Sequence, residues 1–193
     1  APKAKVLDVG CCAGIVGFLL LKECSEITYH GVDVNAEALE HFERLLPEVF
    51  GSVPERVLLE CGTLPKTSAL YDVILLGEII EHVPEPVSWL QGIMKRHLAP
   101  EGRILLTTPW GSFDDGHPPE KKFQGDLRDE RGHLRAYSAR SLCVDIRAAG
   151  GAIHELRKTV VSIGGDAACA VIGHDTQCTK PAVAVAVAGA LWK

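Results

Sequence analysis

The feature that most constrains the fold of this chain is the alternation of short apolar runs with segments of helical spacing. This alternation is typical of βαβ units, in which helices connect the parallel strands of one sheet. We therefore expect an α/β protein with a doubly wound, mostly parallel sheet of seven strands and helices on both faces. The predicted strands cover 5–10, 27–34, 56–62, 71–78, 102–109 and 152–161, and the predicted helices cover 14–24, 36–50, 86–98 and 138–150.

The seventh strand is predicted near the end of the chain, at 181–189. Because no helix separates it from the strand at 152–161, we expect these two strands to pair antiparallel. The segment 164–178 between them follows neither a strand nor a helix pattern. With 193 residues the chain has the size of one domain, which we expect to span 1–193. A strand that begins almost at the first residue is also typical of a domain excised from a longer chain.

Residues 110–137 interrupt the alternation with a stretch rich in Gly, Pro, Asp and Lys. This stretch is longer than the usual connections of about 2–6 residues in α/β units, and long loops of this kind often cover binding sites. We therefore expect an insert or lid at 110–137. Its aromatic residues either wall a binding pocket or anchor the loop, and they are Trp110, Phe113, Phe123 and Tyr137.

The composition argues against several classes of protein. The formal net charge is −5 and no basic stripe is visible, which argues against DNA binding and disfavours RNA without excluding it. The seven cysteines form no C-x-x-C pair, so neither a zinc knuckle nor a disulfide framework is indicated, and a reducing cytoplasm is the expected compartment. No apolar run reaches the roughly 18 residues of a membrane-spanning helix. The oligomeric state stays open.

A glycine-containing loop follows the first predicted strand, at the place where doubly wound sheets bind ligands. The loop, DVGCCAGIVG (8–17), allows two interpretations. A dinucleotide loop, G-x-G-x-x-G, fits only at CAGIVG, where Cys12 replaces the first glycine. A loop of the form acid-x-Gly-x-Gly-x-Gly fits with Asp8, Gly10 and Gly14, and here Cys12 replaces only the middle glycine.

Asp8 distinguishes the two interpretations. A carboxylate at the end of a buried strand is costly unless it has a partner, and a cofactor with a cationic amino group supplies one. The loop resembles the first motif of the class I S-adenosylmethionine-dependent methyltransferases, which have a Rossmann-like sheet. By this resemblance Asp8, Gly10, Cys12 and Gly14 line the methionine part of the cofactor, with Asp8 reaching its amino group directly or through water. A positive φ at Cys12 would cost about 1 kcal/mol or more.

Further candidate cofactor residues follow the second and third predicted strands. Asp33 lies about 20 residues beyond the glycines, where a carboxylate can accept hydrogen bonds from both ribose hydroxyls. The resemblance extends the cofactor site to Val34 beside it and to Gly77 after the fourth strand. It also implies that Gly62 and Thr63 contact the adenine, mainly through the backbone, because the Asp that caps the adenine in the family is missing here.

The motif E-x-x-E-H follows the fourth predicted strand and supplies candidate catalytic residues. Glu78, Glu81 and His82 are spaced i, i+3 and i+4, so a helical turn would place them on one face. These groups can bind a divalent cation such as Mg²⁺ or Mn²⁺, or His82 can act as a base beside Glu81, or the turn only shapes a pocket. The motif is similar to that of ubiquinone-pathway O-methyltransferases and of small-RNA 3′-terminal 2′-O-methyltransferases. The second resemblance implies His133 as a further metal ligand, with His117 as the less favoured substitute.

Three functions stay open on the sequence alone. The leading interpretation is an S-adenosylmethionine-dependent methyltransferase that acts on an oxygen of a small-molecule acceptor, with or without a metal ion. The first alternative is an RNA 3′-terminal 2′-O-methyltransferase. The second is a cofactor-binding module without catalysis, which Cys12 and the missing adenine-capping Asp suggest.

Overall fold

The computed structural model describes residues 4–109, 133–161 and 165–174 of the chain. Its helices and its first four strands lie within a residue or two of the predicted ones, whereas the fifth strand begins four residues earlier, at Leu98. The strands are β1 (Ala4–Val9), β2 (Ile27–Asp33), β3 (Val57–Cys61), β4 (Tyr71–Gly77), β5 (Leu98–Pro109), β6 (Ala152–Val161) and β7 (Gly165–Gly173). The helices are α1 (Ile15–Glu23), α2 (Ala36–Phe50), α3 (Pro86–His97), α4 (Ala139–Ala148) and the short 3₁₀ helix η1 (Ile80–His82).

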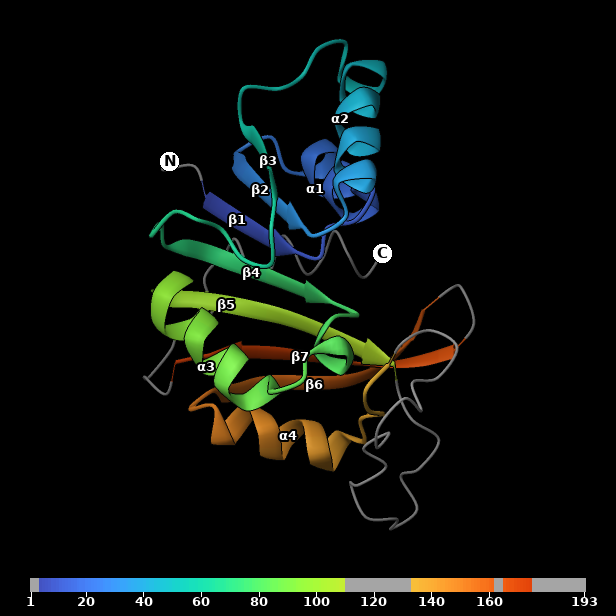
Figure 1. The fold of residues 1–193 in the computed structure, drawn as a ribbon. Helices are drawn as coiled ribbons and strands as arrows, with labels where there is room; N and C mark the ends of the chain where they lie inside the picture. The colour runs from blue at the N-terminus through green and yellow to red at the C-terminus, as the bar shows by residue number, and fades with distance from the viewer. Residues whose placement is uncertain (1–3, 110–132, 162–164, 175–193) are drawn as a thin grey trace. The chain divides into compact units, whose positions relative to one another are not determined.

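The seven strands form one mixed sheet in the order β3-β2-β1-β4-β5-β7-β6 (Figure 1). β2 pairs parallel with β1 and with β3, whereas β7 pairs antiparallel with β5 and with β6. This order confirms the predicted α/β class, a mostly parallel seven-stranded Rossmann-like sheet with an antiparallel final strand. The chain divides into two compact units, one from Ala1–Leu75 and Arg96–Arg103 and one from Leu76–Lys95 and Ile104–Thr176, as far as these residues are described. The single domain over 1–193 stays a prediction.

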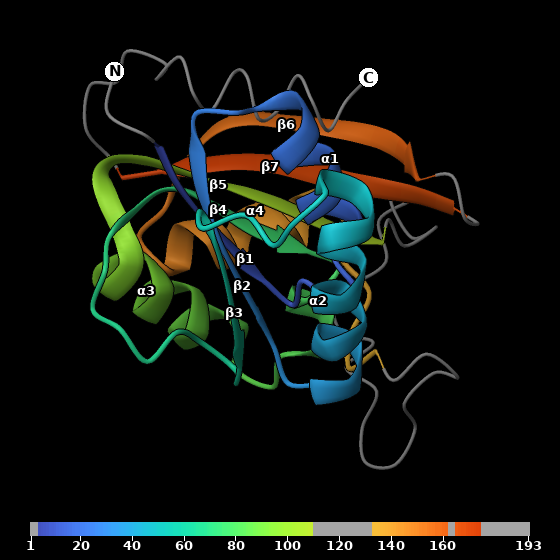
Figure 2. The ribbon, with the colours of Figure 1, turned by 90° about the horizontal axis from the view of Figure 1, so that it is seen from above.

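In the first unit, α1 and α2 lie side by side and pack on one face of the strands (Figures 1 and 2). The ring of Phe42 on α2 lies 4.7 Å from the ring of Phe18 on α1 and 5.9 Å from the ring of Tyr29 on β2, both measured between centroids. α2 begins after Asn35, whose side chain accepts a hydrogen bond from a backbone amide of the first turn. The buried stripe of this helix consists of Leu39, Phe42 and Leu46.

In the second unit, β7 lies between β5 and β6, and α4 packs against β6. α4 begins with a capping box, in which the side chains of Ser138 and Ser141 each accept from the other's backbone amide. The partner of β6 is β7, which corrects the expectation that 181–189 would take this place. The run GDAACAVIG mixes small residues with few branched ones and so gives a weak strand pattern, and 181–189 lies outside the described residues.

None of the described helices is long and apolar enough to cross a membrane. Five cysteines of the described part of the chain are free thiols, and they are Cys11, Cys12, Cys24, Cys61 and Cys143. Two of them, Cys11 and Cys12, follow β1 directly in the predicted cofactor loop, where Cys11 is buried and Cys12 is exposed.

Candidate functional site

The loop after β1 has the backbone conformation that its glycines predict. Gly10, Cys12 and Gly14 all have positive φ, at 76°, 49° and 81°. This region of φ is easy for glycine and costs a residue with a Cβ about 1 kcal/mol or more. Cys12 therefore occupies a position built for glycine, as the motif predicted, and its exposed side chain fits there without being packed.

Gly14 is also required because the ring of Phe42 leaves no room for a side chain at this position. A Cβ built on Gly14 would lie 2.4 Å from the ring of Phe42, closer than carbon atoms approach one another in proteins. Gly14 also precedes the first turn of α1, and no side chain caps that turn. The first amide groups of α1 are therefore left to solvent or to a ligand, as in sites where a loop leads into a helix N-terminus.

Asp33 at the end of β2 holds the loop in place. Its Oδ2 accepts a hydrogen bond from the Cys12 amide at 2.8 Å, and its Oδ1 accepts one from the Asn35 amide at 2.8 Å. The carboxylate thus links the loop after β1 to the start of α2. Each oxygen keeps a second lone pair, so these bonds leave Asp33 able to accept from the ribose hydroxyls predicted for it.

The segment after β3 lies beside the same strand end. The Gly62 amide donates to the Asp33 carbonyl oxygen at 2.9 Å, and the Cys61 thiol lies 3.7 Å from the Val34 carbonyl oxygen. Val34 and Thr63 are both exposed, and 68% of the Val34 surface is accessible. The structure therefore brings Asp33, Val34, Gly62 and Thr63 together at the carboxyl ends of β2 and β3. The contact of Asp33 with the ribose and that of Gly62 and Thr63 with the adenine stay predictions.

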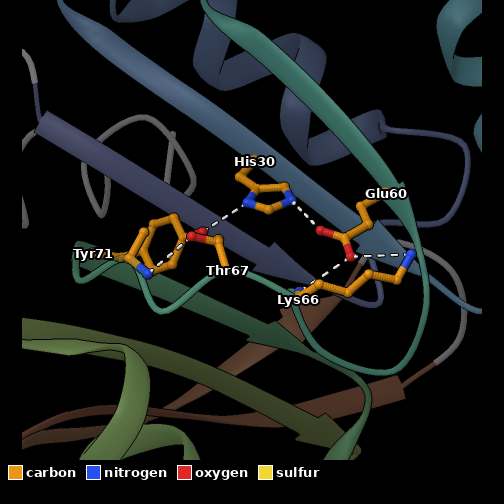
Figure 3. A network of polar contacts seen from close by, with 6 residues as sticks. His30, Glu60, Lys66, Thr67 and Tyr71 are labelled. Carbon is orange, nitrogen blue, oxygen red and sulfur yellow. Dashed lines mark hydrogen bonds and ion pairs between the residues drawn. The ribbon is translucent and has the colours of Figure 1, made fainter.

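A polar network connects this segment to β2 and to the first residue of β4 (Figure 3). Glu60 on β3 accepts from the Lys66 amide at 3.1 Å and contacts the imidazole of His30 on β2 at 3.2 Å. The other ring nitrogen of His30 lies 2.7 Å from the hydroxyl of Tyr71, and both His30 and Tyr71 are buried. Burial lowers the pKa of His30 and outweighs the opposing effect of Glu60. A neutral imidazole can accept from Tyr71 through Nδ1, whereas its buried Nε2 lies close to Glu60 without the geometry of a hydrogen bond.

Asp8, the predicted partner of the cofactor amino group, is buried at the end of β1. Its Oδ2 accepts a hydrogen bond of 2.6 Å from the hydroxyl of Tyr29 on β2. Burial raises the pKa of Asp8 from 3.8 to about 6, although the bond from Tyr29 opposes this shift, and the charge of Asp33 adds to it. The carboxylate is therefore costly to ionise in the unliganded protein and gains from a cation placed against it.

A second cluster lies in the second unit, around η1. Single ligand atoms of Glu81, His82 and His133 all lie within 4.8 Å of one another, and the two imidazole rings are 4.9 Å apart between centroids. Glu81 is buried, His133 is half-buried and His82 is exposed. The structure thus brings together three of the four predicted metal ligands.

Glu81 is the buried acid of this cluster. Its Oε2 accepts from the Thr108 hydroxyl on β5 at 3.0 Å, whereas its Oε1 is buried and has no hydrogen-bond partner among the described residues. Burial raises the pKa of Glu81 to about 7, and the charge of Glu78 adds to this shift. An unpartnered buried oxygen next to two imidazoles is a feature that a cation would satisfy.

Arg135, to which the sequence assigned no role in this cluster beyond a possible basic patch, holds the cluster in place. Its guanidinium donates to the carbonyl oxygens of Ile80, Val83 and Pro84, and the amide of Leu134 donates to the Glu81 carbonyl oxygen at 2.9 Å. These bonds join the segment that carries His133 to the turn that carries Glu81 and His82. The one feature of the sequence that could have pointed to Arg135 is its position two residues after His133, a candidate ligand.

The remaining predicted residues have separate positions. Glu78 precedes η1, is exposed, has a φ of 51° and does not belong to the group of converging ligands among the described residues. Gly77 is exposed at the end of β4. Tyr137 is buried and donates to Asp145 on α4, so it packs against this helix. His117 and the predicted aromatic residues of 110–132 lie outside the described residues.

A family model described as a methyltransferase domain matches residues 7–104 of the chain. The chain is 35% identical over 107 residues to the ubiquinone biosynthesis O-methyltransferase of Pectobacterium carotovorum subsp. carotovorum (strain PC1). This alignment covers 54% of the chain and 42% of that relative, so the chain spans less than half the length of the relative it matches.

Solved structures agree with this classification at the level of the fold. The glycopeptide N-methyltransferase MtfA in complex with S-adenosyl-L-methionine matches with a TM-score of 0.68 at 14% identity, over 90% of this chain and 82% of that one. The methyltransferase domain of bacterial CtHen1-C matches with a TM-score of 0.63 at 24% identity, over 90% of this chain and 91% of that one. The fold of the chain is the one that these methyltransferases share. The chain belongs to the methyltransferase domain family.

Proposed function

We propose that this protein transfers the methyl group of S-adenosylmethionine to an oxygen of a small-molecule acceptor, with a divalent cation bound by Glu81, His82 and His133. The observation that carries the proposal is the convergence of these three side chains within 4.8 Å. The relative from Pectobacterium supports the choice of oxygen, because it is named an O-methyltransferase. The net charge of −5 favours a small molecule over RNA.

The residues present fit a divalent cation. Glu81 offers Oε1, which is buried without a hydrogen-bond partner, and the two histidines offer imidazole nitrogens. Mg²⁺ prefers oxygen ligands only, whereas two imidazoles and one carboxylate suit Mn²⁺ or other first-row metals. Of the two ions that the sequence suggested, the donor set therefore favours Mn²⁺. When bound, such an ion supplies Lewis acidity that lowers the pKa of an acceptor hydroxyl.

The side chains of this protein then have separate tasks. Asp8, Gly10, Cys12 and Gly14 hold the methionine part of the cofactor, Asp33 and Val34 hold the ribose, and Gly62 and Thr63 contact the adenine. Glu81 and His133 hold the cation. His82, the exposed member of the cluster, either completes the cation site or accepts the proton that the acceptor hydroxyl loses. Because methyl transfer is an in-line displacement, positioning of donor and acceptor supplies much of the rate.

The cation site is tested by Mn²⁺ binding to the purified protein, measured by calorimetry or electron paramagnetic resonance. We expect the wild-type protein to bind Mn²⁺, and Glu81→Gln and His133→Asn to bind it at least about tenfold more weakly. Glu85→Gln is the matched control, because it replaces an exposed carboxylate close to the same turn by an amide, and it should bind Mn²⁺ as the wild type does. Unchanged binding in Glu81→Gln, or no binding in the wild type, would show that the cluster is not a metal site.

The acceptor class is tested by methyl transfer from labelled S-adenosylmethionine. We expect labelling of catechols or other vicinal diols and loss of turnover when a chelator is added. Turnover that resists the chelator but falls in His82→Asn would assign His82 as the base. Labelling confined to RNA 3′ ends, with steep salt dependence, would support the RNA alternative. Cofactor binding without transfer to any acceptor would support the non-catalytic module.

A further inference from the structure

Tyr29 occupies a space that two glycines leave open under the cofactor loop. A Cβ on Gly17 of α1 would lie 2.7 Å from the Tyr29 hydroxyl oxygen, and a Cβ on Gly31 of β2 would lie 3.0 Å from its ring. Gly31 is also the register partner of Asp8 in the parallel pair of β1 and β2. The absence of side chains at Gly17 and Gly31 therefore lets the Tyr29 ring reach Asp8 beneath the loop.

The Tyr29 side chain is almost completely enclosed. It is 1% exposed, its ring contacts Phe42, and its hydroxyl donates to Asp8 Oδ2 at 2.6 Å. Phe42 in turn blocks the space beside Gly14. A phenol buried in this way has little freedom to turn, so it fixes the direction of the Asp8 carboxylate as well as donating to it.

We propose that Tyr29 is a positioning residue for cofactor binding, whose hydroxyl orients the Asp8 carboxylate and keeps it charged for the amino group of S-adenosylmethionine. This inference rests on the proposed role of Asp8. Neither the sequence motif nor the resemblance assigns a role to Tyr29, which lies on the second strand and not in the loop.

The charged groups around Asp8 show why the hydroxyl matters. Asp33 on β2 is a second carboxylate, and its charge raises the pKa of Asp8. Cys11 in the loop is a buried thiol whose own pKa is raised by burial and by Asp8, so it stays neutral, and Cys12 is exposed. Tyr29 likewise has a raised pKa and stays a donor. Among these neighbours, Tyr29 alone lowers the pKa of Asp8, which is about 6 with the bond in place.

Removal of this bond has a consequence that depends on pH. In Tyr29→Phe the pKa of Asp8 rises further, and loss of one such hydrogen bond corresponds to a rise of about one unit. The fraction of ionised Asp8 then falls about eightfold at pH 5.5 but by less than about 1.5-fold at pH 7.5. A purely structural defect in the loop would instead weaken binding by the same factor at both values of pH.

The test is S-adenosylmethionine binding, measured by calorimetry between pH 5.5 and 7.5, where an α-amino group is mostly protonated. We expect Tyr29→Phe to bind about eightfold more weakly than the wild type at pH 5.5 and nearly as tightly at pH 7.5. Tyr137→Phe is the matched control, because it also removes a buried hydroxyl, which bonds to Asp145 on α4 and not to Asp8. Its ratio to the wild type should not change with pH.

The outcomes separate this inference from the proposed function. If Asp8→Asn weakens binding but the ratio between wild type and Tyr29→Phe is constant over pH, or equal to one, Asp8 keeps its role and the inference on Tyr29 is wrong. If Asp8→Asn binds as tightly as the wild type, the role of Asp8 is wrong and the inference fails with it. If Tyr29→Phe fails to fold, Gly17→Ala displaces the same hydroxyl and should give the same dependence on pH.

Discussion

Replacement of Asp8 by Asn should stabilise the unliganded protein while it weakens cofactor binding. Asn keeps the shape of the side chain and an oxygen that accepts from Tyr29, but it removes the buried charge. The pKa of Asp8 is about 6 in the folded protein and 3.8 as an ordinary side chain, so the folded state binds more protons than the unfolded state between these values. Stability therefore falls as the pH rises through this window, and the loss is complete above about pH 6 to 7.

The size of the effect follows from the two pKa values. At pH 8 the raised pKa costs the folded wild type about 3 kcal/mol, and at pH 5 it costs about 1.6 kcal/mol. Asp8→Asn carries neither cost. The buried amide hydrogens of Asn introduce a penalty of their own, but this penalty is the same at both values of pH. The stability difference between variant and wild type should thus shift by about 1.4 kcal/mol in favour of the variant between pH 5 and pH 8.

Urea unfolding of both proteins at pH 5, 6.5 and 8 measures this shift directly. Asp72→Asn is the control, because Asp72 is an exposed carboxylate that accepts one backbone hydrogen bond, from Lys5. S-adenosylmethionine at 100 times its Kd should raise the free energy of unfolding of the wild type by about 2.7 kcal/mol, and that of Asp8→Asn much less. A stability difference that does not change with pH would refute the reasoning about the buried charge.

Three further predictions concern the loop and the cluster. Cys12→Gly removes about 1 kcal/mol of left-handed backbone strain and adds a similar cost in chain entropy, so the Tm should stay within about 3 °C of the wild type. Calorimetry should show tighter S-adenosylmethionine binding. Weaker binding would mean that the thiol contributes a contact to the cofactor. Gly14→Ala should destabilise the protein by about 2–4 kcal/mol in urea unfolding, and Phe42→Leu in the same chain should restore part of this loss, whereas additive effects would contradict the steric account. Arg135→Met should lower stability by about 1–3 kcal/mol and weaken Mn²⁺ binding, and an unchanged affinity would show that the three carbonyl contacts of Arg135 do not position the ligands.

Much of the proposed cofactor site could be predicted from the sequence, because its conformation depends on residues that are near one another along the chain. Positive φ at Gly10 and Gly14 follows from the glycine spacing, and the position of Asp33 follows from the length of one βα unit. The substitution at Cys12 was visible as a departure from the motif, and the structure confirms that it falls on a positive φ. These features depend on residues that lie close together in the sequence, so the order of residues is enough to predict them.

The antiparallel end of the sheet shows where local rules fail. The sequence did not predict the strand at 165–173, because GDAACAVIG has few branched residues. It predicted the last strand at 181–189 instead, where the alternation is stronger. β7 is instead specified by the two strands that flank it, since both of its edges form hydrogen bonds with β5 and β6. A strand that is held on both sides needs less intrinsic propensity than one at an edge.

The sequence by itself determined the α/β class, the turn in the loop after β1 and the candidate acids at the strand ends, because periodicity and glycine placement act over a few residues. Only the tertiary structure decided which of those groups meet. It placed Tyr29 against Asp8 through the gaps at Gly17 and Gly31, and it joined His133 to Glu81 and His82 across 50 residues of chain while leaving Glu78 apart. Contacts of this kind depend on packing between elements, which no spacing along the chain encodes.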